Sequence, residues 1–145
     1  EPMPRLSRFL FGGWPKVKHY SFNNDNRSII VSAKYIDHLG RSHERTVSVE
    51  NRVWTINDQI SGFSNYAILR WRLGKSEWAV KGNQVASKVA SINIHVGSGE
   101  IVEMKLVKGF ESIYYNEVSD INVLEIKLNK PCIITTIITL AIEIN

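Results

Sequence analysis

Apolar and polar side chains alternate with a period of two residues along most of this sequence. The alternation runs through residues 29–36, 43–50, 91–96, 102–108 and 122–129. A period of two places successive side chains on opposite faces of a strand, whereas a helix repeats its apolar positions about every 3.6 residues. Stretches rich in Gly, Asn and Ser separate the segments and are typical of turns. The pattern therefore predicts an all-β fold, an antiparallel β-sandwich of two packed sheets with about ten short strands.

The last apolar segment, residues 132–144, departs from this alternation. Its side chains are mostly apolar or Thr on both faces, and many are β-branched, which suits a pleated surface. This composition is typical of a central strand covered on both sides, or of a strand at an interface with a further domain.

The first 18 residues also lie outside the alternating pattern. They contain three of the four prolines, the run "FGGWP" and several basic side chains. We expect residues 1–18 to form a linker or wrapping segment, and residues 19–145 to form the sandwich domain. The chain begins at Glu1 and shows no secretory leader pattern, so we expect a processed chain or a piece of a longer protein.

Composition narrows the class of protein. A length of 145 residues suits one domain, and a hydrophobic fraction of 43% supports a packed core and argues against intrinsic disorder. No apolar run approaches the roughly 20 residues of a membrane-spanning helix. The single Cys excludes an internal disulfide, and the net charge of +4 is too small to identify a partner by itself.

Common catalytic and cofactor motifs are absent from the sequence. The four His residues lack the paired spacing of metal ligands, and no phosphate-binding or dinucleotide-binding motif is present. The segment "GSGE" at residues 97–100 is expected to be a hairpin turn between two strands. No "GxSxG" motif supports a serine hydrolase, and Cys132 opens an apolar strand, where a buried structural role is expected. The sequence therefore predicts no metal and no cofactor.

Residues 35–73 are the most informative stretch. His43 and Arg45 share a strand face with the valines that follow them, near the strand end where that face can open to solvent. Arg70 and Arg72 alternate with Trp71 and its apolar neighbours. The apolar face that carries Trp71 is expected to pack in the core. Arg70 and Arg72 are therefore predicted to lie on the opposite face, where they form a row of basic side chains that we call the basic ladder.

This stretch resembles the C-terminal β-sandwich domain of the heparinase II/III-like polysaccharide lyases. The matching features are "HER" at a strand start, where the family has His-x-Arg, then "IND" and "ISG", and then "ILRWRL", where the family has an aromatic-containing strand. Residues 111–140 resemble the family's ending, a short strand, a Ser- or Tyr-containing turn and a final β-branched strand. The resemblance covers roughly residues 20–140.

The resemblance implies a bacterial, periplasmic or cell-surface protein in which a preceding α/α-toroid domain of the same chain carries most of the catalytic machinery. The implied reaction is β-elimination of an acidic polysaccharide. Such chemistry neutralises the uronate carboxylate, removes the C5 proton with a base, commonly Tyr or His, and protonates the leaving oxygen with an acid. The sandwich forms one wall of the cleft, with His43 and Tyr35 as its catalytic candidates. We expect this domain alone to be inactive.

Two departures from the family pattern bear on this expectation. Many members carry His-Asp-Gly-Tyr before the His-x-Arg, but with Tyr35 in the Tyr place no His stands among residues 32–34. A second frequent His, in the aromatic-containing strand, is replaced by Arg72. Either the toroid residues act alone, or the protein binds a glycan without cleaving it.

The candidates for contact with the polysaccharide are Arg45, Arg70, Arg72 and Trp14. A guanidinium group matches uronate or sulfate oxygens, and Trp14, outside the strand pattern, is a candidate stacking surface or interdomain contact. Each arginine also has a structural alternative. Arg45 can pair with a carboxylate such as Asp58, and the ladder can be an ordinary solvated face.

Two other function classes remain open at this stage. A non-catalytic carbohydrate-binding or interaction module is favoured by the missing His positions. The second class is nucleic-acid binding, which is suggested by a pI near 9.3. A nucleic-acid site needs clustered basic charge with exposed aromatics, whereas Lys and Arg are spread here among 14 acidic residues. The sequence therefore predicts no nucleic-acid partner.

Overall fold

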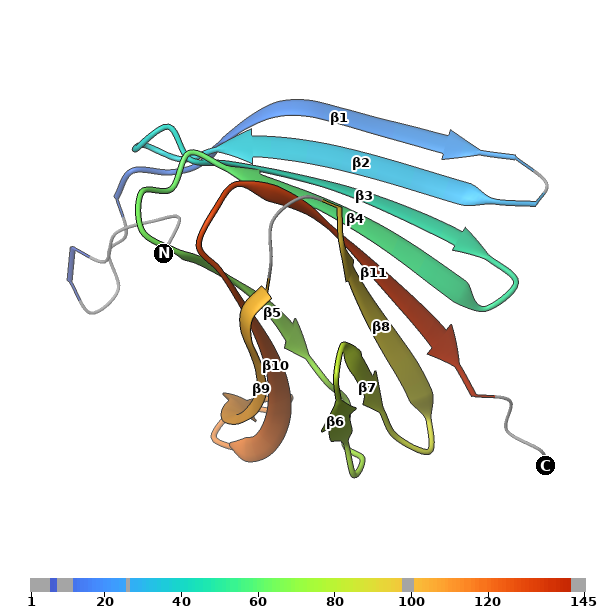
Figure 1. Ribbon diagram of the computed structural model, residues 1–145. Helices are drawn as coiled ribbons and strands as arrows, with labels where there is room; N and C mark the ends of the chain where they lie inside the picture. Colours follow the sequence, from blue (N-terminus) through green and yellow to red (C-terminus); the bar gives the residue numbers. More distant parts are fainter. Residues whose placement is uncertain (1–5, 8–11, 26, 98–100, 142–145) are drawn as a thin grey trace.

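The computed structural model of the chain describes residues 6–7, 12–25, 27–97 and 101–141. These residues form eleven strands in two antiparallel sheets (Figure 1). The all-β sandwich expected from the sequence is confirmed.

The large sheet has eight strands in the order β1-β2-β3-β4-β11-β8-β7-β6. Its strands are β1 (Lys16–Asn24), β2 (Ile29–Ile36), β3 (Ser42–Glu50), β4 (Val53–Ser61), β6 (Ala79–Lys81), β7 (Gln84–Ala86), β8 (Ala90–Val96) and β11 (Cys132–Leu140). The small sheet has the order β5-β10-β9, with β5 (Ala67–Arg72), β9 (Ile101–Glu111) and β10 (Ser119–Leu128).

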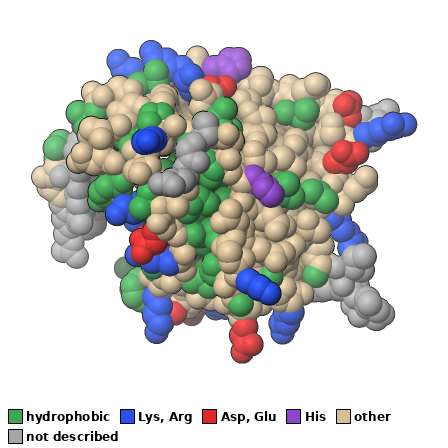
Figure 2. All heavy atoms as spheres, in the orientation of Figure 1, with side chains coloured by type: hydrophobic (Ala, Val, Ile, Leu, Met, Phe, Trp, Pro, Cys, Tyr) green, Lys and Arg blue, Asp and Glu red, His purple; other side chains and the backbone are tan. Residues whose placement is uncertain are grey.

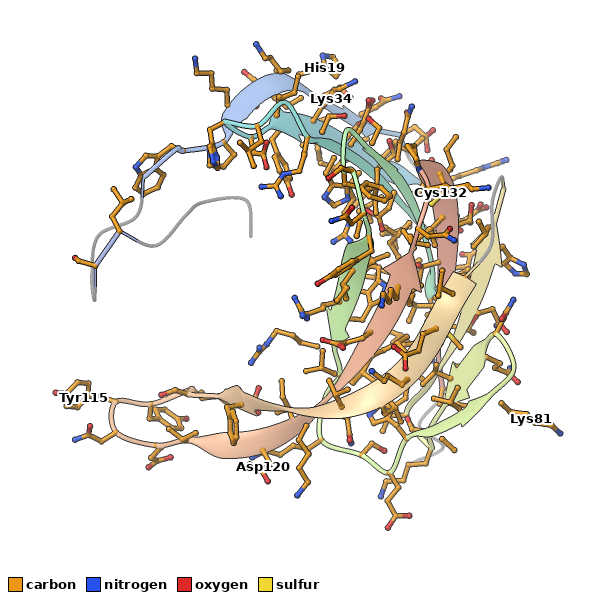
Figure 3. All side chains as sticks on the ribbon, turned by 60° about the vertical axis from the view of Figure 1, so that its left-hand side comes forward. His19, Lys34, Lys81, Tyr115, Asp120 and Cys132 are labelled. Atoms are coloured by element: carbon orange, nitrogen blue, oxygen red, sulfur yellow. The ribbon has the colours of Figure 1, made fainter. Side chains whose placement is uncertain are left out.

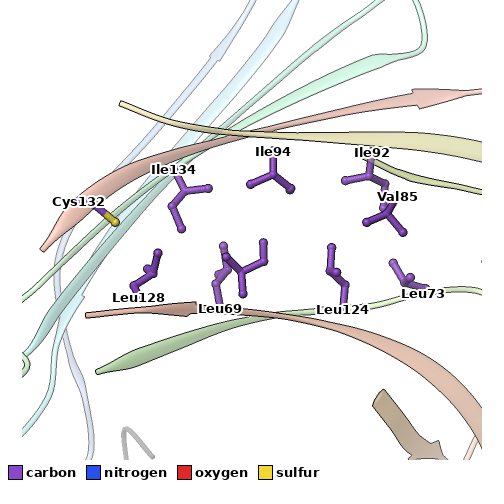
Figure 4. Close-up of a cluster of buried hydrophobic side chains, with 10 residues drawn as sticks. Leu69, Leu73, Val85, Ile92, Ile94, Leu124, Leu128, Cys132 and Ile134 are labelled. Atoms are coloured by element: carbon purple, nitrogen blue, oxygen red, sulfur yellow. The ribbon is translucent and has the colours of Figure 1, made fainter. Parts of the chain in front are cut away.

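The core lies between the two sheets, as the close-up in Figure 4 shows. Alternate side chains of β5 and β10 meet alternate side chains of β8 and β11, as the period of two in their sequences requires. The buried cluster consists of Leu69, Leu73, Val85, Ile92, Ile94, Leu124, Ile126, Leu128, Cys132 and Ile134. The burial of Cys132 agrees with its expected structural role, and burial also raises the pKa of its thiol.

We call the face of the large sheet that meets the small sheet its inner face. Strand register divides the inner face of β1 to β4 into two ends. The polar end, where β2 finishes and β3 begins, carries Tyr35, His43, Arg45 and Asp58. The apolar end, where β1 and β3 finish, carries Phe22, Ile29, Val31, Val47, Val49, Ile56 and Trp54.

The small sheet covers only part of this inner face. Every described residue of β1 is exposed, and Val31 on β2 is 41% exposed, whereas Ile56, in the same row on β4, is 3% exposed. Figure 3 shows the large sheet curving so that β1 and β2, where His19 and Lys34 are labelled, stand clear of the small sheet. The β9–β10 hairpin also extends away from the core, with Tyr115 at its tip (Figure 3). We call this hairpin the hairpin arm. The sandwich is therefore closed over β4, β11 and β8 and open over β1 to β3.

Several local expectations can be compared with the strands. The prediction that "GSGE" closes a hairpin is wrong, because β8 and β9 flank it and belong to different sheets. Residues 98–100 themselves lie outside the described residues. The crossing is favoured because β8 and β9 carry apolar side chains that meet across the core, so the link joins layers instead of neighbours.

The final strand is central, as its composition indicated, since β11 lies between β4 and β8. It is buried on the inner face, but Ile133 on the outer face is 46% exposed. Coverage on both sides is therefore not found within the described residues. At the other end of the chain, β1 begins at Lys16, so the last residues of the expected linker belong to the sheet, and residues 1–5 and 8–11 of that linker lie outside the described residues.

Candidate functional site

Asp58 is the centre of the polar end. Its carboxylate has no exposed surface and accepts hydrogen bonds from Arg45, at 2.7 Å from Nε to Oδ1 and 3.1 Å from Nη2 to Oδ2. His43 Nε2 lies 2.5 Å from Asp58 Oδ1. Burial opposes ionisation of Asp58, but the hydrogen bonds from His43 and Arg45 and the charge of Arg45 outweigh it, so the pKa of Asp58 is below its ordinary value. The expected pairing of Arg45 with Asp58 is confirmed.

This ion pair also fixes the tautomer of His43. An ionised carboxylate can only accept, so Nε2 of His43 must carry the proton that lies toward Asp58. In the neutral ring Nδ1 is then the acceptor. The second contact of His43 is edge-to-face with Tyr35, with ring centroids 5.5 Å apart and planes at 79°.

Arg45 is held from a second side by the small sheet. Its guanidinium carbon lies 4.5 Å from the ring centroid of Trp71 on β5, a cation–π distance. The Trp71 indole N–H is buried and has no hydrogen-bond partner within the described residues. The Arg45 side chain therefore ties β5 to β3 and is engaged by the protein itself.

The turn between β2 and β3 forms the rim of the polar end. Asp37 accepts hydrogen bonds from the backbone N–H of Leu39 and Arg41 and from Arg41 Nε at 2.6 Å. Burial works against the charge of Asp37, yet these hydrogen bonds leave its pKa below the ordinary value. A Cβ on Gly62, which has φ +82°, would lie 2.8 Å from the backbone oxygen of Gly40. Only glycine permits this approach, which holds the rim against the end of β4.

Tyr35 stands between the rim and His43. Its pKa is raised, first by burial and then by the negative charge of Asp37. A raised pKa keeps the phenol protonated at neutral pH, so Tyr35 is suited to donate a hydrogen bond or a proton and poorly suited to act as a base.

These groups border an open pocket of about 510 Å³ between the large sheet and β5. Tyr35, Asp37, Arg41 and His43 line one side of the pocket. The other side comes from β5 and the residues before it, and it is lined by Phe63, Tyr66, Ile68 and Arg70. Aromatic faces with a few fixed polar groups are the usual lining of a small-molecule or sugar site. We therefore take this pocket as the candidate functional site.

The charges around the pocket are already paired. Arg70 Nε lies 2.7 Å from Glu125 Oε1, Arg45 pairs with Asp58, and Arg41 pairs with Asp37. Figure 2 likewise shows Lys and Arg interspersed with acidic side chains over the face that it draws. The pocket therefore has no strong field of one sign, and it acts on a ligand through individual groups.

The residues selected from the sequence are only partly gathered here. Tyr35, His43 and Arg70 line the pocket, and Arg45 adjoins it through Asp58. Arg72 is exposed, as the predicted ladder requires, but its guanidinium donates to the backbone carbonyl of Phe110 on β9. This hydrogen bond ties Arg72 to the β9–β10 hairpin, and Arg72 is not among the residues that line the pocket.

Trp14 lies apart from the pocket, and the rim was not selected from the sequence. Trp14 is 70% exposed, precedes β1 and is not among the lining residues. The rim pair of Asp37 and Arg41 was missed, although the local signal existed, an Asp followed three residues later by a turn glycine, Gly40 with φ +78°.

The described residues contain no group of three or more His, Cys, Asp or Glu side chains that could hold a metal ion. They also contain no helix with the length and apolar character needed to cross a membrane.

The fold, an antiparallel β-sandwich of two sheets, is shared with parts of longer chains of known structure. A solved structure of the heparinase III–BT4657 gene product superposes with a TM-score of 0.74 at 16% identity, over 88% of this chain and 21% of that chain. The heparan sulfate lyase HepC from Pedobacter heparinus gives a TM-score of 0.73 at 14% identity, over 86% of this chain and 22% of that chain. The chain thus spans about a fifth of the length of the solved structures it matches. No family model and no curated protein matches the sequence. The resemblance that the sequence showed is confirmed at the level of the fold.

Proposed function

We propose that this chain is the C-terminal sandwich domain of a heparinase II/III-like lyase that cleaves acidic polysaccharide by β-elimination, and that the pocket lies on the wall of its cleft. One observation carries the proposal. Tyr35, His43 and Arg70, all selected from the sequence, border one pocket in a fold shared with heparinase III and HepC.

The side chains suit supporting roles in such a reaction. Tyr35, whose pKa is raised, keeps a proton for the leaving oxygen, while His43 with Nε2 protonated offers Nδ1 as an acceptor. Arg70 is the best placed partner for a uronate carboxylate. The Arg70 side chain is 58% exposed and uses Nε to bind Glu125, so its terminal N–H groups can meet a substrate carboxylate while the pair with Glu125 is kept. The remaining machinery, including the base, belongs to a preceding α/α-toroid domain in this proposal.

The test is turnover by the longer protein. Heparan, chondroitin, alginate and capsular polymers would be screened for the absorbance of unsaturated uronate ends. We expect a signal with at least one polymer, none from the 145-residue chain alone, and a loss of about tenfold or more with Tyr35→Phe, because one acid–base group typically contributes at least that much. Absence of any signal across the panel would count against the lyase assignment.

A second candidate is a non-catalytic glycan-binding module. It is favoured by the pairing of Asp58 with His43 and Arg45, since groups held so firmly serve structure as readily as catalysis. This alternative predicts measurable affinity of the 145-residue chain for a glycan without turnover by the longer protein. Isothermal titration with Arg70→Ala and Arg72→Ala separates the two arginines. Affinity should fall for Arg70→Ala and change little for Arg72→Ala, because only Arg70 lines the pocket.

A further inference from the structure

The apolar end of the inner face is an exposed surface that the small sheet does not cover. Phe22 is 68% exposed, and Ile29, Val31 and Trp54 are 41–44% exposed. The register of β1 to β4 makes these side chains direct neighbours, so they form one patch and not scattered surface residues. Contiguous exposed apolar patches mark interaction surfaces.

The patch is continuous with an interface that already exists in the molecule. One row crosses the inner face from Phe22 through Val31 and Val47 to Ile56, and then continues through β11 to Ile94. Ile56 and Ile94 in that row are buried against the small sheet, whereas the first members are open. Thr136 on β11 is the polar member of this row, and its members on β1 to β4 and β8 are all apolar but differ in how far they are covered. The open part of the row therefore has the composition of a packed interface.

The chemistry of the patch limits what can cover it. Its two rows carry no charged side chain on β1 to β4, so neither a polyanion nor a nucleic acid finds a partner there. Pairing through the edge of the sheet is also disfavoured. β1 is the edge strand, and its register shifts between Val17 and His19, next to Lys16 and Lys18. Such irregularities and lysines discourage a further strand from adding to an edge.

We infer that the apolar end is the surface on which another domain of the same, longer chain packs. We assign the cover to a domain because the matched part makes up only 21–22% of the solved chains that share this fold. A full gene product of similar length would have enough further chain to cover the apolar end. The inference rests on the proposed function only in requiring a longer chain. With the apolar end covered, the pocket at the polar end lies at the margin of a domain interface, where ligand sites commonly occur.

Hydrogen exchange of two forms of the protein tests this inference. Exchange of the β2 and β3 amides would be followed in the 145-residue chain and in the full gene product. We expect exchange at the apolar end to be at least about tenfold slower in the full gene product, because packing suppresses local opening. Val31→Ser in the full gene product should restore fast exchange. Ile30→Ser is the matched control, because Ile30 is 38% exposed on the opposite face of the same strand, and it should leave the protection in place.

Four results would overturn the inference. One is equal exchange at the apolar end in the two forms, and a second is a gene product that contains no further domain. The third is protection of the isolated chain that grows with its concentration and is abolished by Val31→Ser, which would assign the face to a second copy. The fourth is slower exchange at the apolar end of the isolated chain when heparan sulfate alone is added. None of these readouts uses turnover, so an inactive protein with a protected apolar end would refute the lyase proposal and leave this inference standing.

Discussion

The two ends of the inner face lie on the same strands but serve opposite purposes. At the polar end, His43 and Arg45 bind the buried carboxylate of Asp58, and Tyr35 contacts the His43 ring. At the apolar end, Phe22 and Val31 are apolar and remain 68% and 41% exposed. One end is complete within the described residues, and the other end requires something further.

The difference shows how a β-sheet can separate a site from a docking surface. Side chains along a strand share a face at every second position, so two steps of two residues, about 13 Å, carry the same face from Tyr35 to Val31. Polar groups gathered at one end orient one another through short hydrogen bonds. Apolar groups gathered at the other end gain only from being covered. Single substitutions at either end of the inner face test this difference.

The largest effect is expected from Asp58→Ala. Removing the buried carboxylate leaves Arg45 and His43 without their acceptor, and breaking a buried ion pair costs about 3 kcal/mol at the lower end of its range. We use the lower end of this range because the Arg45 side chain is 35% exposed, so water can partly solvate its guanidinium once the carboxylate is removed. Urea unfolding measures the change. Glu44→Ala is the control, since its pair with Lys34 is on the outer face and partly exposed, and a loss as large as that of Asp58→Ala would contradict this reading.

The same centre predicts a dependence of stability on pH. The pKa of Asp58 is lower in the folded chain than the ordinary value of 3.8, and so is that of Asp37. Their contributions are therefore fully present above 3.8 and are lost as the pH falls through the lower folded pKa values. Unfolding free energies of the wild type and Asp58→Ala should converge as the medium is acidified below 3.8. A gap between the two proteins that stays constant with pH would exclude an electrostatic origin.

Period-two alternation predicted the faces of these strands because it depends only on local geometry. It put His43 and Arg45 together on the inner face and Arg70 opposite the core, and it allowed the pairing of Arg45 with Asp58. It did not predict the division into eight and three strands, or the passage from β8 to β9 between sheets. Those features depend on contacts between distant segments, such as the pairing of Thr135 with Asn57, whose energy no local pattern reveals.

The local sequence pattern also could not predict which residues of the inner face the small sheet covers. Val47 and Ile56 carry the same period-two signal and face each other in register, yet only Ile56 is buried. Whether a residue is covered depends on where β5 and β10 lie above it, which is a property of the whole fold. The sequence therefore predicted which side chains share a face better than which of them form the core.

A smaller effect is expected where the apolar row is already covered. Thr136 is fully buried in the row of Ile56 and Ile94, and its hydroxyl has no partner within the described residues. Thr136→Val should stabilise the chain by about 1 kcal/mol, because it removes an unsatisfied polar group at nearly constant shape. Thr135→Val is the matched control on the outer face, where the hydroxyl donates to Asn57 at 2.7 Å and its loss should destabilise. Equal effects of the two variants would mean that the Thr136 hydroxyl is satisfied after all.

The smallest effect concerns the open part of the row. In the 145-residue chain, Val31→Ser and Ile30→Ser should each cost about 1 kcal/mol and differ little from one another, because the two residues are adjacent on β2 and are 41% and 38% exposed. Thermal unfolding of the isolated chain should therefore not distinguish the inner face from the outer face at this point. If Val31→Ser alone is strongly destabilising, the inner face at Val31 is already packed within the isolated chain, and the contrast between the two ends of the inner face fails. If the two variants are equal here and differ only when further domains are attached, the apolar end gains its stability from outside these residues.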